Sequence, residues 1–145
     1  MNPLTVRILF AFFLIAHGLV PVSLTNVPVP APGALRTPYL PSWWRTNIDS
    51  VWPASRIGLP PEVVQTAGWL LWLSWAVLLA AAGAGLLGFP GLGVLWQTLA
   101  SAGAVLSLIL LVFYWHPWLI LGLLINAFIL AGVFAGWFTR WFAVQ

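Results

Sequence analysis

Residues 114–140 decide the fold, and they read YWHPWLILGLLINAFILAGVFAGWFTR. Between Trp118 and Arg140 this stretch carries no charged side chain. A helix of about 20 apolar residues crosses the roughly 30 Å hydrocarbon layer of a bilayer. Tryptophans at both ends suit the two membrane interfaces. We therefore predict a transmembrane helix over residues 117–142, with a single polar side chain, Asn126, near the middle of the membrane.

The composition of the whole chain points the same way. The 145 residues are 62% hydrophobic and 5% charged, and the mean hydropathy is +1.03. A soluble domain of this length does not need so much apolar surface, so the class is all-α integral membrane protein. The absence of cysteine excludes thiolate metal sites, iron–sulfur ligation and covalently attached haem. The five arginines are scattered, so no basic patch predicts a nucleic-acid partner.

Three further apolar runs predict helices over residues 4–24, 62–87 and 92–114. The first run is long enough to span a bilayer, which favours a retained helix over a cleaved signal peptide. The prediction is a four-transmembrane-helix bundle forming a single membrane domain over residues 1–145. Small residues four apart predict where helices touch, because close packing drives helix association in lipid. These rows are Ala80/Ala84/Gly88, Ala100/Ala104, Gly103/Ser107, Ala127/Ala131/Ala135 and Gly132/Gly136.

A long segment rich in proline and tryptophan, residues 25–61, separates the first two predicted helices. Proline at this density excludes a long helix or a central strand. The segment is too apolar for a free linker, so we expect it to lie at the membrane surface with tryptophan rings at headgroup level. We expect it to contact lipids and larger membrane-protein subunits. The residues proposed for that contact are Trp43, Trp44, Arg45, Asp49 and Trp52.

Polar side chains from several predicted helices fall at one depth in the membrane. His17, Ser107 and Asn126 each lie several residues inside a helix, counted from the end next to the long loop, and Trp69 is placed with them. An unpaired polar group in hydrocarbon costs several kcal/mol, so these groups are expected to bond one another. The plain interpretation is an interhelical hydrogen-bond network that fixes packing. The alternative is a quinone or proton site in which His17 titrates.

Other chemistry finds little support in the sequence. His17 and His116 are the only histidines, and their different depths disfavour a haem held between them. His116 precedes Pro117 and suits a helix cap or a surface contact. No carboxylate lies inside a predicted membrane span, and no catalytic or metal-binding spacing appears. We therefore expect no enzyme activity, no bound cofactor and no metal.

Two stretches resemble a known family. The opening RILFAFFLIAHGL, residues 7–19, resembles the start of DoxX-like four-helix bacterial membrane proteins, and WHPWLILGLLIN, residues 115–126, is similar to the last helix of related uncharacterised proteins. In the related pattern an acid often stands at the position of Asn126 and a second histidine at that of Pro21. The resemblance implies a bacterial cytoplasmic membrane and association with a quinone-linked oxidoreductase. It carries over no catalytic residue.

The hypothesis that we prefer is a non-catalytic accessory subunit of a multi-subunit membrane electron-transfer complex, respiratory or photosynthetic. The alternative is a small quinone- or lipid-binding membrane enzyme or carrier that uses His17 and Asn126, with Trp69 nearby. Four spans place both termini on one side of the membrane. The arginine count slightly favours a cytoplasmic loop, but the apolar, tryptophan-rich loop resembles an exported cap, so we expect cytoplasmic termini.

Overall fold

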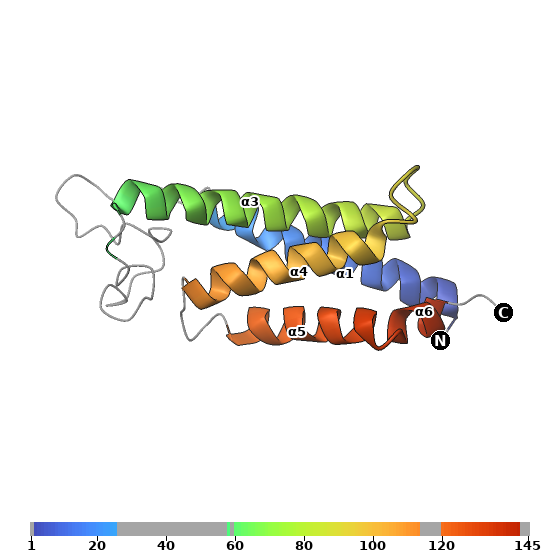
Figure 1. Ribbon diagram of the computed structural model, residues 1–145. Helices are drawn as coiled ribbons and strands as arrows, with labels where there is room; N and C mark the ends of the chain where they lie inside the picture. The colour runs from blue at the N-terminus through green and yellow to red at the C-terminus, as the bar shows by residue number, and fades with distance from the viewer. Residues whose placement is uncertain (1, 26–57, 59, 114–119, 143–145) are drawn as a thin grey trace.

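The computed structural model describes residues 2–25, 58, 60–113 and 120–142. These ranges fold into helices and contain no strand: α1 (Pro3–Thr25), α3 (Pro61–Leu86), α4 (Trp96–Phe113), α5 (Ile120–Phe134) and α6 (Trp137–Phe142). Figure 1 shows the long helices side by side in an elongated bundle, with the start of α1 and α6 at the same end. The all-α prediction is confirmed for the described residues. The predicted loop lies almost entirely outside them.

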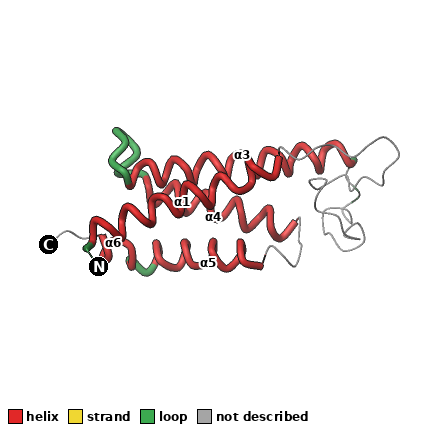
Figure 2. The backbone as a smooth tube through the Cα atoms, turned by 180° about the vertical axis from the view of Figure 1, so that it is seen from behind, coloured by secondary structure: helices red, strands yellow, loops and turns green. Residues whose placement is uncertain are grey.

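The helices pack in a simple order. α1 packs on α3, α3 on α4 and α4 on α5, while the short α6 contacts both α5 and the first part of α1. The view from behind in Figure 2 shows the same arrangement, with α6 beside the start of α1. This topology places residues from the middle of four helices around one common interior.

Glycines set the contact between α1 and α3. A Cβ atom on Gly83 would lie 2.6 Å from the carbonyl oxygen of Ala11, and one on Gly18 would lie 2.9 Å from that of Ala76. Neither position has room for a side chain. Because helices in lipid associate through close packing, these two glycines bring the backbones of α1 and α3 together and fix their antiparallel register.

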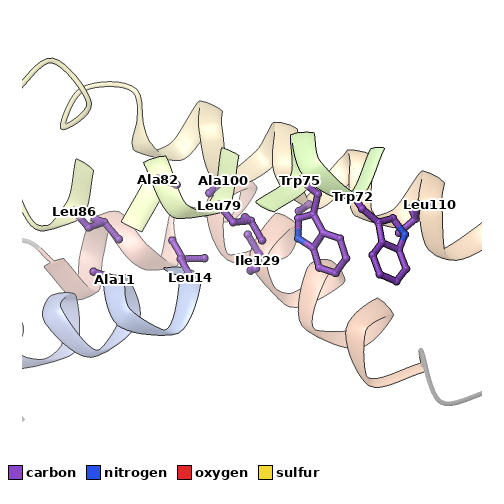
Figure 3. Packing of buried hydrophobic residues seen from close by; sticks show 11 residues of the cluster. Ala11, Leu14, Trp72, Trp75, Leu79, Ala82, Leu86, Ala100, Leu110 and Ile129 are labelled. Atoms are coloured by element: carbon purple, nitrogen blue, oxygen red, sulfur yellow. The ribbon is translucent and has the colours of Figure 1, made fainter. Parts of the chain in front are cut away.

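The rows of small residues predicted from the sequence have mixed outcomes. Ala100, Ala104 and Ser107 on α4 are fully buried and Gly103 is buried beside them, so both α4 rows form helix contacts. Figure 3 shows Ala100 and the buried leucines around it. The row at positions 127, 131 and 135 was wrong as a contact within the bundle, because all three alanines are exposed. The four-residue spacing identifies a helix face made of small residues, but it does not say whether that face points into the bundle or outward.

The chain turns sharply after α3. Gly88 has a φ of 93°, and the N–H groups of Gly88 and Phe89 donate to the carbonyls of Gly85 and Ala84 at 3.1 and 3.0 Å. These bonds form a Schellman cap, for which a left-handed glycine is the usual residue. Turns continue to Leu95, so α4 begins at Trp96 rather than at the predicted residue 92.

The predicted helix over residues 117–142 is divided in two. α5 ends at Phe134, Gly136 adopts a φ of 65°, and α6 starts at Trp137. Glycine takes this left-handed conformation without the penalty that a side chain imposes. The break lets Phe138, which is fully buried, stack on Phe10 of α1 with ring centroids 4.3 Å apart. Aromatic packing thus replaces a straight continuation of the helix.

Arginine side chains support two helix ends at the same end of the bundle. Arg7 Nε donates to the carbonyl of Leu86, the last residue of α3, at 2.7 Å. Arg140 donates from one terminal nitrogen to the carbonyl of Ala135 at 2.9 Å and from Nε to that of Gly136 at 3.3 Å. The carbonyl of Leu86 lacks a partner within α3 and carries partial negative charge, so the Arg7 guanidinium stabilises it. The carbonyls of Ala135 and Gly136 belong to the turn between α5 and α6.

Three described helices are long and apolar enough to cross a membrane. The candidate spans are Pro3–Val20, Thr66–Leu86 and Trp96–Phe113. α5 is apolar but has only 15 residues, a length of about 22 Å. The structure therefore indicates a membrane protein with three candidate spans among the described residues.

Candidate functional site

Asn126 is the centre of the polar layer. It lies on α5 and is fully buried. Its amide nitrogen donates to Ser107 Oγ on α4 at 2.7 Å and to the carbonyl of Gly122, one turn earlier on α5, also at 2.7 Å. Both amide hydrogens are therefore used, and the Ser107 contact joins α4 to α5 through two fully buried side chains.

His17 extends the layer to α1. Its Nε2 atom lies 3.4 Å from Asn126 Oδ1. Because the amide nitrogen of Asn126 already donates to two acceptors, its oxygen must be the acceptor here, and Nε2 of His17 must carry the hydrogen. This distance is longer than the usual 2.9–3.0 Å for such a bond. The contact between α1 and α5 is therefore the weak link of the layer.

Aromatic rings surround His17. Phe13, one turn earlier on α1, is parallel to the imidazole with ring centroids 5.9 Å apart. Trp75 on α3 meets it edge to face at 5.3 Å. Trp75 is 6% exposed, and its indole Nε1 has no hydrogen-bond acceptor among the described residues. Figure 3 shows Trp75 and Trp72 extending from α3 into the interior. The four helices α1, α3, α4 and α5 thus each contribute one polar side chain.

Trp75 takes the place that the sequence argument gave to Trp69. The Cβ position of Gly18 faces Ala76 and Ala80 on α3, so the level of His17 lies near these residues. Trp69 is seven residues from Ala76, about 10 Å along the helix axis. It also points about 120° away from Trp75 around the helix, and it is 47% exposed. Placing Trp69 beside His17 was therefore wrong.

The structure thus brings together His17, Ser107 and Asn126, and it adds Trp75 to them. The signal for Trp75 was present in the sequence, because Trp69, Trp72 and Trp75 recur at three-residue spacing. Such a row drifts around a helix with 3.6 residues per turn, and only its last two members are buried. The proposed contact residues of the loop, Trp43, Trp44, Arg45, Asp49 and Trp52, lie outside the described residues, as does His116.

The arrangement offers hydrogen bonding rather than metal ligation. Within the described ranges no group of three His, Cys, Asp or Glu side chains comes together. What the layer supplies is a chain of donors and acceptors from His17 through Asn126 to Ser107, with one further buried donor on Trp75. Comparison with known proteins adds no relative, since no family model, curated protein or solved structure matches the chain.

Proposed function

We propose that this protein is a non-catalytic accessory subunit of a multi-subunit membrane complex. The proposal rests on the observation that the buried polar side chains bond one another across helices. Asn126 and Ser107 are fully buried and bond each other, so the layer holds helices together. The outer faces are apolar, with Leu121 65% exposed on α5 and Leu70 61% exposed on α3. Such faces suit lipid chains and the helices of larger subunits.

The complex that we propose is a quinone-linked electron-transfer assembly of a bacterial cytoplasmic membrane. The support is the resemblance of residues 7–19 and 115–126 to DoxX-like proteins and their relatives. In this role the subunit stabilises assembly and shapes the lipid or quinone surroundings of its partners. Electron transfer itself belongs to those partners.

We further propose that the chain crosses the membrane four times, with α5 and α6 together making the last crossing. α5 lies beside α4, which is itself a candidate span. Arg7 and Arg140 lie at the same end of the bundle. Three of the five arginines are in segment 25–61, but the apolar, tryptophan-rich composition of that segment suits an exported cap, so we assign the termini to the cytoplasm. Reporter fusions at the two termini should therefore both report the cytoplasm. Opposite locations of the two reporters would contradict a four-span topology.

The subunit proposal is tested by extraction in mild detergent. The tagged protein should migrate with larger subunits on a native gel, and mass spectrometry should identify these as membrane oxidoreductase components. A photo-crosslinking residue at the exposed positions 121 and 70 should map which face they touch. Deletion of the gene should lower quinone reduction by isolated membranes, while the purified protein alone should show none. A stable lone monomer with no effect of deletion would contradict the proposal.

A further inference from the structure

We propose that the buried indole N–H of Trp75 is a binding site for an external oxygen acceptor, placed beside His17 in the interior of the bundle. The acceptor is a neutral oxygen with lone pairs, supplied either by one internal water molecule or by the carbonyl of a lipid-soluble molecule. The inference does not depend on the accessory-subunit role. It rests on the state of two neighbouring donors, one on α3 and one on α1.

The first donor is Trp75 Nε1, which is buried and has no acceptor among the described residues. A donor without a partner in an apolar interior costs free energy comparable to a lost hydrogen bond or more. Buried indole N–H groups therefore usually find a partner. The acceptor of Asn126, Oδ1, lies against His17 Nε2 at 3.4 Å, and Trp75 Nε1 does not donate to it.

The second donor is Nε2 of His17, whose bond to Asn126 is only weakly made at 3.4 Å. The two imperfect donors belong to rings whose centroids are 5.3 Å apart. An oxygen that accepts two hydrogen bonds of about 2.9 Å joins donors up to about 5.8 Å apart, and two rings in contact can present donors within that range. The geometry points to an oxygen that accepts from Trp75 and draws on His17.

His17 also lies on the route by which an oxygen acceptor can reach Trp75 from outside the bundle. Its side chain is only partly buried, and Phe13, against which it lies, is 36% exposed on the outer face of α1. Trp75 Nε1 is covered, so an oxygen reaches it only when a neighbouring group such as the imidazole shifts. A ring held by one long hydrogen bond and an exposed neighbour can do so. A carbonyl dissolved in the lipid phase can thus approach from the α1 side.

The test follows the Trp75 indole N–H by NMR of the full chain in detergent, with ¹⁵N-labelled tryptophan. Its signal is assigned as the one missing in W75F, which keeps an aromatic ring and loses the donor. W72F is the matched control, because Trp72 is a buried tryptophan one turn away on the same helix. The probes are bulk water, through magnetisation transfer to the N–H, and decylubiquinone as the lipid-soluble carbonyl.

The expected result is a hydrogen-bonded indole shift for Trp75. Transfer from water that persists when decylubiquinone is added identifies water as the source. A saturable shift of the Trp75 signal with decylubiquinone, also present in W72F, identifies the carbonyl. In W75F, where that signal is absent, the decylubiquinone affinity read from the remaining tryptophan signals should be about tenfold weaker, as expected for one lost hydrogen bond. A shift typical of a free N–H both without and with decylubiquinone overturns the proposal. So does a bonded N–H that responds to neither probe, because its acceptor would then belong to the protein.

Discussion

Replacing Asn126 by leucine should weaken the attachment of α5 to the rest of the bundle. Leucine keeps a similar volume but removes the hydrogen bonds to Ser107, Gly122 and His17. Interhelical hydrogen bonds in membrane proteins average about 0.6 kcal/mol and reach about 1.7 kcal/mol. The bond to Ser107 is short and fully buried, so it should approach the upper value. We expect N126L to lose about 1–2 kcal/mol of unfolding free energy.

A double-mutant cycle divides this loss between the two partners. S107A with N126L should give a coupling of about 1–1.5 kcal/mol, and H17F with N126L about 0.5 kcal/mol or less. The difference follows from the distances of 2.7 and 3.4 Å and from the partial exposure of His17. The Ser107 coupling stays modest because a serine hydroxyl can turn to a carbonyl of its own helix.

The assay is reversible unfolding of the purified protein in mixed micelles, followed by helix content and tryptophan fluorescence. Each single variant and each pair is measured under the same detergent conditions, and L124A, a truncation of an exposed residue of α5, serves as the neutral control. No coupling between positions 107 and 126, or a larger coupling at position 17, would refute the reasoning from distance and burial.

Three further substitutions test the packing. G132A should lower the free energy of unfolding by about 1–3 kcal/mol through overpacking, because its Cβ would lie 2.3 Å from the Phe138 ring. G122A, whose Cβ would meet only Leu111 at 3.5 Å, should be nearly neutral, and thermal unfolding distinguishes the two variants. G83V should separate α1 from α3, seen as a loss of crosslinking between cysteines introduced at positions 14 and 79 in the two helices; wild-type crosslinking would count against it. R7M should leave the carbonyl of Leu86 without its guanidinium donor and lower the free energy of unfolding by about 1 kcal/mol. Amide hydrogen exchange should become faster only in the last turn of α3, and unchanged exchange there would show that the contact is not stabilising.

Much of the fold could be predicted because it depends on the average hydropathy of each segment of the chain. Hydropathy over about 20 residues measures whether a helix can stay in lipid, and it located α1, α3 and α4 to within a few residues of their observed bounds. Counting depth along each helix also placed His17, Ser107 and Asn126 at one level, and the structure joins them by hydrogen bonds. Counting from helix ends works only where those ends are level, and on α3 it placed Trp69 about 10 Å from the level of His17.

Direction around the helix could not be obtained in the same way. Trp69 also points about 120° away from Trp75, which lies beside His17, because the facing side of α3 depends on contacts with α1 and α4. The alanines of α5 formed a regular row that points outward for the same reason. In a soluble helix polar residues mark the outer face. A helix that is apolar all round carries no such mark in its own sequence.

The break at Gly136 shows a third kind of information, which lies in pairs distant along the chain. Glycine is common in membrane helices, so Gly132 and Gly136 alone did not predict an interruption. The break is required because Phe138 packs between Gly132 and Phe10. More than 120 residues separate Phe10 from Phe138, and no local pattern connects them.

These contacts divide the bundle into two parts held by different forces. α1 and α3 approach so closely at Gly18 and Gly83 that backbone packing alone can hold them. α5 has no comparable close approach, since a Cβ on Gly122 would make only ordinary contact with Leu111 of α4. Lipid tails compete equally well for its apolar surface. Its attachment therefore depends more on Asn126 in the middle and Phe138 at the end, so the loss of Asn126 should weaken the contacts of α5 before those between α1 and α3.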